Sequence, residues 1–494
     1  MLKITKINES FSYCDGTKEE LTTAFNFLKI YDPSTKYDRL VQIGIRSPYK
    51  CFGSMQQGKL LIYNGHTHLV DSTYQQPTFK DDVIEFKNIL KDMNLPFEPY
   101  DYQIRAVGYA LLYKRTLLKS CTSSGKSLVI SMILEYFRRK GLKGVLIVPN
   151  INLLTQFKAD IESYGLDALY NEIQVHGDGN KSTFDTVLTI STWQSLVDEK
   201  RTNFDFIICD EVHRFASEVT SDIIQRCVNT PIRLGFTGTL PENPVDKMTL
   251  LGLFGEPKTI ITSKELIGRG LGCPVSIKSI ILNYNNVSKA EFRECTDYQK
   301  QLQYIIDHQR RNEIIVRLCA GLSLKNQNSL VLFQRTNHGK QLFIDIMKTL
   351  YPEVNVENKD IVGKKSLEFQ KQYNVFFLNG EQSSNIREEV RHILEDMPNA
   401  ILVSNYALLS TGVSIKALKN LILASPMKAF TTVSQSLGRL MRLHKDKKEA
   451  FVYDIVDNFS YKKPSGIFWK QYQHRIANSY NPEDFGITET TINL

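Results

Sequence analysis

Short apolar runs, each followed by small or polar residues, recur through the middle of the chain. They occupy residues 116–118, 144–149, 186–190, 206–209 and 233–236, with helix-like stretches between them. A strand that is apolar along its whole length is buried on both faces, as in a parallel sheet covered by helices. The pattern therefore predicts a doubly wound α/β domain, whose ligands lie at the carboxyl ends of the strands.

A second series of the same kind follows. A long helical pattern at 298–322 precedes apolar runs at 330–333, 375–378, 401–403 and 421–424. This series predicts a second α/β domain. It contains no phosphate-binding loop, so any nucleotide that it contacts has to be bound mainly by the first domain.

The first 95 residues predict a small mixed module. Residues 22–31 have the pattern of a short amphipathic helix, and 41–45 and 59–63 that of hairpin strands. The expected fold class is therefore α/β: two doubly wound parallel-sheet domains with a small N-terminal α+β accessory domain. We expect the accessory domain at 1–95, the sheet domains at 96–274 and 275–460, and a basic, aromatic tail at 461–494.

Length and composition limit the class of protein. A chain of 494 residues is too long for a single hydrophobic core, so it is expected to form more than one domain. Its content of 42% hydrophobic and 23% charged residues is typical of globular proteins. The apolar runs are too short to span a membrane, and the first residues carry charge where a signal peptide is apolar. Eight cysteines without a CxxC pair indicate a reduced protein without a zinc site. We expect a cytoplasmic protein, and the net charge of +8 is compatible with a polyanionic partner.

Residues 120–127 read Ser-Cys-Thr-Ser-Ser-Gly-Lys-Ser between a predicted strand and a predicted helix. Small residues and a helix start suit a loop that binds phosphates through its backbone. Ser120 replaces the first glycine of the full pattern, so an ordinary helix start is the alternative. The predicted nucleotide-binding residues of this loop are Cys121, Thr122, Ser123, Ser124, Gly125, Lys126 and Ser127.

The run 206–209 ends in Asp210 and Glu211, followed by Val212 and His213. A buried strand that ends in two carboxylates can present one to Mg²⁺ and the other to the attacking water. An exposed acidic turn is the alternative, which the phosphate loop upstream disfavours. We expect Ser127 and Asp210 to hold Mg²⁺, Glu211 to be catalytic, and Asp210 and His213 to contribute to the ATP site. Gln103, ahead of the strand that leads to the loop, is the candidate for reading the adenine edge.

Residues 435–442 read Gln-x-x-Gly-Arg-x-x-Arg. The spacing places Arg439 and Arg442 on one helical face, and two guanidinium groups can stabilise charge on a phosphoryl group in transfer. A solvated basic face is the alternative. Gln435, Arg439 and Arg442 are therefore predicted to be catalytic, as groups supplied by the second domain.

Lysines and aromatic residues are interleaved in two further places. In the accessory domain, a nucleic-acid surface and ordinary strand aromatics with solvated lysines remain equally open; the residues concerned are Lys36, Tyr37, Arg39, Arg46, Tyr49, Lys50, Phe52 and Lys59. In the tail, the sequence leaves open whether the aromatic residues bind nucleic acid or pack on the second domain.

Taken in order, these motifs resemble those of the superfamily 2 helicases, over about 350 residues. The resembling segments are 120–127, 210–213, 237–239, 410–414 and 435–442. Thr-Trp-Gln at 192–194, Asp-Glu-Val-His at 210–213 and Gln-x-x-Gly-Arg-x-x-Arg at 435–442 are similar to the group that contains the phage UvsW-type branch-migration helicases and the Rad25-like translocases. The resemblance implies two RecA-like domains and ATP with Mg²⁺, and it adds Gly412 to the ATP site. It also implies nucleic-acid contacts by Pro149, Thr192, Trp193, Gln194, Arg335 and Thr411.

The expected function is that of an ATP-dependent DNA helicase. It would unwind and remodel branched DNA, such as forks and four-way junctions, in recombination, replication and repair. The expected partners are branched and single-stranded DNA, bound by a monomer, with oligomers on DNA left open. Three alternatives remain: a restriction-type translocase that does not separate strands, an RNA-directed helicase, and an ATP-gated clamp without catalysis.

Overall fold

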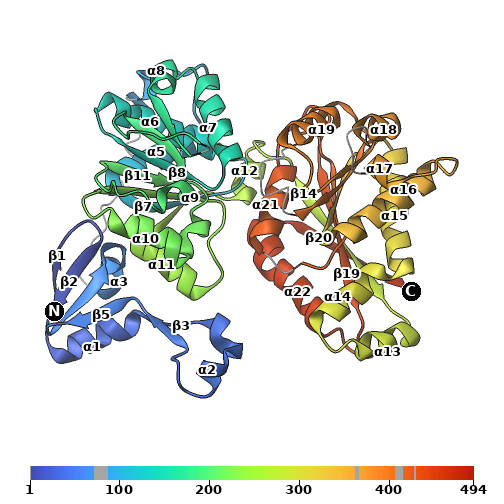
Figure 1. Cartoon of the computed structure of the whole chain (residues 1–494), viewed down its shortest axis with the longest axis horizontal. Coiled ribbons are helices and arrows are strands. Elements are labelled where there is room, and N and C mark those ends of the chain that lie inside the picture. The colour runs from blue at the N-terminus through green and yellow to red at the C-terminus, as the bar shows by residue number, and fades with distance from the viewer. Residues whose placement is uncertain are drawn as a thin grey trace. The chain divides into compact units, whose positions relative to one another are not determined.

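The computed structural model describes residues 2–71, 87–88, 90–177, 179–361, 366–406, 415–427 and 430–494. The chain forms two compact units, Met1–Ile261 and Thr262–Leu494 (Figure 1). Each unit is built on a seven-stranded sheet. No helix among the described residues is both long and apolar enough to cross a membrane.

The sheet of the first unit is parallel throughout, in the order β13-β7-β12-β11-β8-β10-β9. Its strands are β7 (Arg115–Ser120), β8 (Gly144–Val148), β9 (Ile173–His176), β10 (Leu188–Thr192), β11 (Phe206–Cys209), β12 (Ile232–Thr237) and β13 (Pro257–Ile261). Every residue of β8, β10, β11 and β12 is buried. The prediction of a parallel sheet covered on both faces is thus confirmed, because only such a position removes whole strands from water.

Helices lie on both faces of this sheet (Figure 1). They are α5 (Asp101–Tyr113), α6 (Lys126–Arg139), α7 (Ile151–Ser163), α8 (Asp167–Asn171), α9 (Trp193–Leu196), α10 (Glu218–Arg226) and α11 (Pro244–Phe254), with the 3₁₀ turn η3 (Val212–Ala216). Asn150, Ser217 and Asn243 cap α7, α10 and α11 by accepting a hydrogen bond from the first turn. Gly125 precedes α6 without any such side-chain bond, so the start of α6 differs from these three.

The N-terminal module has an antiparallel sheet in the order β1-β2-β6-β5 and lies in the same unit. Its elements are β1 (Lys3–Lys6), β2 (Phe11–Asp15), α1 (Lys18–Phe27), β3 (Lys29–Tyr31), η1 (Pro33–Tyr37), α2 (Arg39–Gln42), β4 (Tyr49–Cys51), β5 (Gly53–Gln56), β6 (Lys59–Tyr63), η2 (Asn64–His66) and α3 (Thr67–Val70). The predicted strand at 59–63 is β6, whereas the predicted strand at 41–45 was wrong. Asp38 caps a helical turn there, and Gly44 adopts a positive φ of 75° that ends it.

The module packs on α11 of the sheet domain. Leu28, Phe52 and Leu60 of the module share a core with Val245 and Met248. The His66 ring lies 2.8 Å from the Met248 carbonyl oxygen through Nε2. A Cβ on Gly65 would meet the carbonyl oxygen of Leu251 at 2.0 Å, so only glycine permits this approach.

The sheet of the second unit is also parallel throughout, in the order β16-β17-β15-β18-β19-β14-β20. Its strands are β14 (Val275–Asn283), β15 (Ser329–Phe333), β16 (Val375–Leu378), β17 (Ile401–Asn405), β18 (Asn420–Leu423), β19 (Ala450–Asn458) and β20 (Gly486–Asn493). The helices are α12 (Ser263–Gly268), α13 (Asn286–Glu294), α14 (Tyr298–Asp307), α15 (Gln309–Leu324), α16 (Thr336–Leu350), α17 (Asn358–Ile361), α18 (Ser366–Tyr373), α19 (Ser384–Asp396), α21 (Phe430–Leu440) and α22 (Ile467–Arg475). This second sheet confirms the predicted pair of RecA-like domains with a small accessory sheet.

Two features of the second unit differ from the sequence pattern. The long helix expected at 298–322 is broken at His308, whose extended backbone ends α14 and whose side chain caps α15. The tail packs on the sheet, which decides between the two alternatives for its aromatic residues. Its strand β20 pairs with β14, and the Tyr472 hydroxyl donates to Glu489 across 2.6 Å.

Candidate functional site

The predicted nucleotide motifs meet at the carboxyl edge of the first sheet. The phosphate loop follows β7, Asp210 follows β11, and Thr237 ends β12. Because β12 lies between β7 and β11, the three loops are neighbours although the chain reaches them far apart in sequence. This edge is where open α/β sheets bind their ligands.

The phosphate loop folds tightly through two residues with positive φ, Ser123 at 69° and Gly125 at 79°. The Ser124 hydroxyl donates to the Cys121 carbonyl oxygen across 2.7 Å and is paired with the Ser120 hydroxyl. Ser120 therefore takes part in closing the loop from the position where the full pattern has glycine. The loop leads directly into α6, whose first turn has no side-chain cap and so suits an anion.

A chain of polar contacts joins the phosphate loop to the acidic pair. Lys126 Nζ lies 2.9 Å from Glu211 Oε1, and His213 Nδ1 lies 3.3 Å from Glu211 Oε2. His213 Nδ1 is also 3.1 Å from the Thr237 hydroxyl. Lys126, the Glu211–His213 turn and Thr237 come from three different segments of the chain, so the contacts tie the ends of β7, β11 and β12 together.

The charges in this cluster shift one another's pKa. Burial opposes the charge of Lys126, but the attraction of Glu211 and Asp210 outweighs it and raises the pKa of the ammonium. Burial also disfavours charge on Glu211, yet Lys126 and His213 lower the pKa of this carboxyl well below its usual value. Burial and the neighbouring Glu211 raise the pKa of Asp210 to about 6. At neutral pH, the cluster thus holds an ammonium beside two carboxylates in a partly water-excluded pocket.

The residues predicted to hold Mg²⁺ offer hard oxygen donors, which this ion prefers. The Asp210 carboxylate is fixed by the backbone N–H of Glu211, which donates to Oδ1 across 2.9 Å. No group of three or more His, Cys, Asp or Glu that could hold a metal occurs among the described residues. Mg²⁺ is usually bound through one or two carboxylates together with substrate phosphates. Ser127 and Asp210 would hold the ion, which would neutralise charge on the phosphates.

Gln103 is buried, 4% exposed, and contacts the phosphate loop. Its Nε2 donates to the Ser124 carbonyl oxygen across 3.0 Å, and its Oε1 accepts from the Tyr100 N–H across 2.9 Å. The amide keeps a second N–H and a second lone pair, so reading adenine stays a prediction. Tyr102 donates its hydroxyl to the same Ser124 carbonyl across 3.0 Å, a contact that sequence reasoning missed.

Four predicted nucleic-acid contacts lie at the carboxyl ends of two adjacent strands. Pro149 follows β8, Thr192 ends β10, and Trp193 and Gln194 begin α9. β10 pairs with β8, with Thr192 opposite Val148. They share the carboxyl edge with the ATP motifs, farther along the sheet. Gln194 is exposed, whereas Pro149 and Thr192 are buried and Trp193 is packed against the core. Their contact with nucleic acid stays a prediction.

The predicted residues of the second unit are placed in part. Gln435, Gly438 and Arg439 lie on α21, and Arg442 follows it, with its N–H bonded to the Arg439 carbonyl oxygen at 3.3 Å. Arg335 precedes α16 and is paired with the side-chain oxygens of Gln299 and Gln303. Thr411 and Gly412 lie outside the described residues.

The segment that leads to α21 is held by a buried ion pair that the sequence did not reveal. Arg475 binds both Asp454 carboxylate oxygens at 2.8 Å and donates to the Met427 carbonyl oxygen across 2.7 Å. The Tyr480 hydroxyl donates to Asp454 across 2.7 Å. Arg475 in the tail is therefore a structural support for the chain between β18 and the predicted catalytic helix.

Comparison with known proteins shows similarity to a family model and to two relatives. A family model described as "Type III restriction enzyme, res subunit" matches residues 96–242. The chain is 29% identical to the ATP-dependent DNA helicase uvsW of Enterobacteria phage T4, over 81% of this chain and 78% of the relative. It is 26% identical to the DNA 3'-5' translocase XPB2 of Sulfurisphaera tokodaii, over 75% of this chain and 85% of the relative.

Among solved structures, the chain is similar to a fragment of an HsdR subunit of a type I restriction enzyme from Vibrio vulnificus. The TM-score is 0.58 at 17% identity, covering 84% of this chain and 72% of the other. At this identity the likeness concerns the fold alone. Together with the relatives, it confirms the resemblance that the motifs predicted.

Proposed function

We propose that this chain, a helicase or translocase of the superfamily 2 type, hydrolyses ATP with Mg²⁺ to unwind and remodel branched DNA. The single observation that supports the ATPase most strongly is the contact between Lys126 and Glu211. It joins a partly buried ammonium at the start of α6 to a carboxylate that follows the central strand β11. These two charges are the ones that phosphoryl transfer to water requires.

In the proposed reaction, the start of α6 and Lys126 bind the phosphates. Lys126 has to leave Glu211 when it engages them, because one ammonium cannot fully satisfy both anions. Glu211 is then available to orient and deprotonate the attacking water, while His213 at its other oxygen continues to favour the ionised carboxylate. His213 contacts the other carboxylate oxygen of Glu211 and also contacts the hydroxyl of Thr237 at the end of β12.

The second unit would supply Gln435, Arg439 and Arg442 to the same reaction. Guanidinium groups stabilise the charge that spreads over the phosphoryl oxygens in the transition state. Arg475 and Asp454 support this part of the proposal, since they fix the chain that precedes α21.

The DNA part of the proposal is supported by the relatives. The T4 relative is named a DNA helicase, and the archaeal relative a DNA translocase. We therefore propose that forks and four-way junctions are substrates, and that the chain acts in recombination, replication and repair. Gln194 and Arg335 are candidates for contacts with a DNA strand, since neither is fully buried.

The experiment that tests the function uses the full chain with ATP and Mg²⁺. Phosphate release and strand displacement would be measured on forked DNA, a four-way junction, plain duplex and RNA, with a non-hydrolysable ATP analogue as the control. We expect forked DNA to stimulate hydrolysis and to be unwound, and Lys126→Ala to abolish both. Unwinding by Lys126→Ala would contradict the assignment of the phosphate loop.

A duplex translocase that does not separate strands is the second candidate. It is favoured by the match to the restriction-enzyme family model. This candidate predicts hydrolysis stimulated by plain duplex and displacement of a bound triplex strand without unwinding of forks. The same set of substrates therefore separates the two functions.

A further inference from the structure

The N-terminal module carries a projecting arm, which we define as residues 29–51. Its two sides are β3 and β4, which pair antiparallel with Tyr31 opposite Tyr49. The rings of Tyr31 and Tyr49 meet edge to face at 5.7 Å, and the Asp32 N–H donates to the Pro48 carbonyl oxygen across 2.8 Å. These contacts close the base of the arm, so that residues 33–47 form a defined tip.

The tip exposes large apolar side chains. Tyr37 is 81% exposed, Ile45 73%, Ile43 58% and Leu40 47%. No residue of η1 or α2, which form much of the tip, is buried. Four large apolar side chains gathered on one short segment are unfavourable in water, and such groupings mark a surface that contacts a partner.

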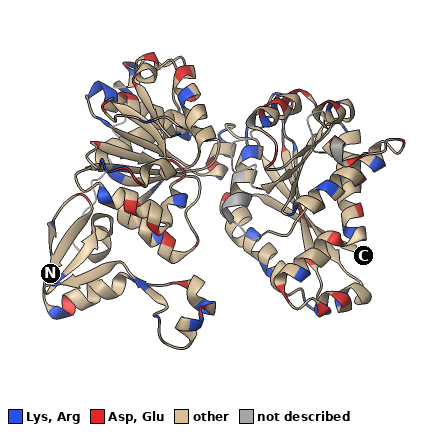
Figure 2. Cartoon of the chain, in the orientation of Figure 1, with Lys and Arg blue, Asp and Glu red and all other residues tan. Residues whose placement is uncertain are grey.

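The charges around these side chains indicate what the partner is. The arm contains five basic residues, Lys29, Lys36, Arg39, Arg46 and Lys50, and two acidic ones. Figure 2 shows Lys and Arg around α2. The acidic residues are used within the arm. Asp32 accepts from Ser34 and caps η1, whereas Asp38 accepts from Leu40, caps α2 and pairs with Arg46 across 3.3 Å. Apolar groups surrounded by surplus positive charge complement unstacked bases flanked by phosphates.

The arm is joined to the first sheet domain. Lys50 Nζ lies 4.0 Å from Glu218 of α10. The pKa of Asp32 is lowered mainly by hydrogen bonds from Ser34 and to a lesser extent by one from Asn243, the cap of α11. Next to the arm, Leu28 and Phe52 share the core with Met248 of α11. The arm is thus attached to two helices of the domain that contains the ATP motifs.

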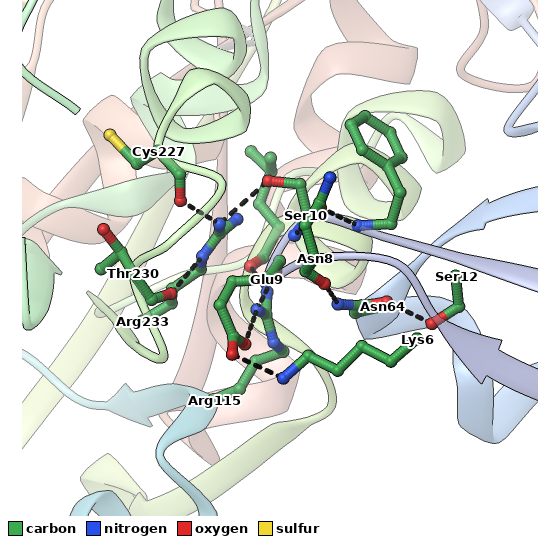
Figure 3. Close-up of polar contacts among 12 residues, drawn as sticks. Lys6, Asn8, Glu9, Ser10, Ser12, Asn64, Arg115, Cys227, Thr230 and Arg233 are labelled. Carbon is green, nitrogen blue, oxygen red and sulfur yellow. Dashed lines mark hydrogen bonds and ion pairs between the residues drawn. The ribbon is translucent and has the colours of Figure 1, made fainter. Parts of the chain in front are cut away.

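A second contact between the module and this domain lies in the β1–β2 turn (Figure 3). The Glu9 N–H donates to the Val228 carbonyl oxygen across 2.7 Å, and the Glu9 carboxylate lies 3.7 Å from the Arg115 guanidinium. Arg233, which is 1% exposed, donates to the Ser10 hydroxyl across 2.9 Å. With the module held at two separated places, a force on the arm is transmitted to the sheet domain.

We propose that this arm contacts the branch point of forked DNA and separates its strands. The apolar side chains of the tip stack on the terminal base pair of the duplex, and the basic residues contact the phosphates beside it. As the motor draws one strand along the chain, the fixed tip blocks the duplex from following. This inference rests on the proposed function, and it names the strand-separating element that the motor requires.

The test uses the full chain with Tyr37→Ala and Ile45→Ala combined. Both side chains are exposed, so their loss leaves the core intact. The matched control combines Val287→Ala and Leu324→Ala, which are 67% and 78% exposed in the second unit. The measured quantity is the number of base pairs separated per ATP hydrolysed on forked DNA. We expect it to fall about tenfold or more in the arm variant, as for the loss of aromatic stacking on a base, and to be unchanged in the control.

A direct probe is a photoreactive benzoylphenylalanine in place of Tyr37. We expect it to crosslink to nucleotides within a few positions of the fork junction and not to the distant duplex. Three results would overturn the proposal. The first is an equal number of base pairs separated per ATP in the arm variant and wild type. The others are crosslinks only to a second copy of the chain, or only to the second unit of the same chain. If the wild-type chain shows no DNA-stimulated ATP hydrolysis, the proposed function is wrong. If the wild-type chain hydrolyses ATP normally and the arm variant separates as many base pairs per ATP, only the role of the arm is wrong.

Discussion

Lys126 Nζ lies 2.9 Å from Glu211 Oε1, so the cation of the phosphate loop is paired with the predicted catalytic carboxylate. Each group stabilises the charged form of the other at a partly buried position. Because phosphates bound by Lys126 would compete with Glu211 for the same ammonium, substitutions at this pair test the proposed reaction.

Glu211→Gln separates binding from hydrolysis. The amide cannot act as a base, so turnover should fall by about 10²- to 10⁴-fold. ATP binding should be equal or tighter, because Lys126 loses the carboxylate that competes with the phosphates. Binding of a fluorescent ATP analogue and phosphate release measure the two effects, with the exposed Glu162→Gln as the control. Weaker binding with normal turnover would contradict the role of Glu211.

Arg442→Ala tests the contribution of the second unit. Loss of an arginine that stabilises a transferring phosphoryl group lowers turnover by about 10³- to 10⁵-fold, and we expect this loss with ATP binding retained. Arg442→Lys should rescue little, because an ammonium lacks the planar fork. Arg317→Ala, at a site 78% exposed on α15, is the matched control. Full activity of Arg442→Ala would remove this residue from the mechanism.

Gly125→Ala tests the packing of the phosphate loop. A Cβ at this position would lie 2.4 Å from Gln103 Nε2 and would also strain a backbone with φ of 79°. Gly141→Ala is the control, since its φ is 69° and a Cβ there meets nothing within 4 Å. Both variants should lose about 1 kcal/mol of stability from backbone strain. Only Gly125→Ala should also weaken ATP binding, and equal affinities in the two variants would contradict the proposed contact with Gln103.

His66 makes stability depend on pH. Its Nε2–H donates to the Met248 carbonyl oxygen, and its buried Nδ1 has no partner among the described residues. Burial lowers the pKa of His66 from 6.5 to about 4. The unfolded state therefore binds a proton first on acidification, and the stability contribution is lost between about pH 6.5 and pH 4. The loss approaches about 3 kcal/mol in the free energy of unfolding.

His66→Gln isolates this effect, because the amide can donate to Met248 without titrating. Urea unfolding at several pH values should show a shallower acid loss in the variant than in wild type. The comparison is needed because burial also lowers the pKa of His338 in the second unit, to about 3. Identical pH profiles would show that His66 does not titrate in this range.

Glu9→Gln tests the attachment of the N-terminal module. Burial and the neighbouring Arg233 lower the pKa of Arg115 to about 9, and Glu9 is the anion that opposes this. Its loss leaves two buried guanidinium groups near each other and should cost about 3 kcal/mol, at the lower end for a broken buried ion pair. Urea unfolding measures the loss, and limited proteolysis should show earlier cleavage in the module. Glu19→Gln on the exposed face of α1 should match wild type, and an equal effect of both substitutions would refute the attachment.

Two details of the fold could not be predicted from the local pattern of hydrophobic and polar residues. Residues 41–45 have the composition of a strand, yet Asp38 and Gly44 impose a helical turn that projects from the module. Residues 298–322 have one helical periodicity, yet His308 divides them into two helices. In both places the backbone conformation at one or two residues decides the structure, against a periodicity that several neighbouring residues share. A prediction from the sequence pattern follows the several residues and misses the exception.

The sequence by itself determined the two parallel sheets and the residues of the ATP motifs. Continuous apolar runs can be satisfied only by strands covered on both faces, and the motif residues are set by local spacing. Only the tertiary structure decided which of these residues meet. The strand order β7-β12-β11 brings the loops of Lys126, Glu211 and Thr237 together. Packing of the N-terminal module pairs Glu9 with Arg115, and packing of the tail on the second sheet pairs Arg475 with Asp454. Contacts between residues so far apart in the chain depend on the packing of whole elements, which leaves no periodic trace in the sequence.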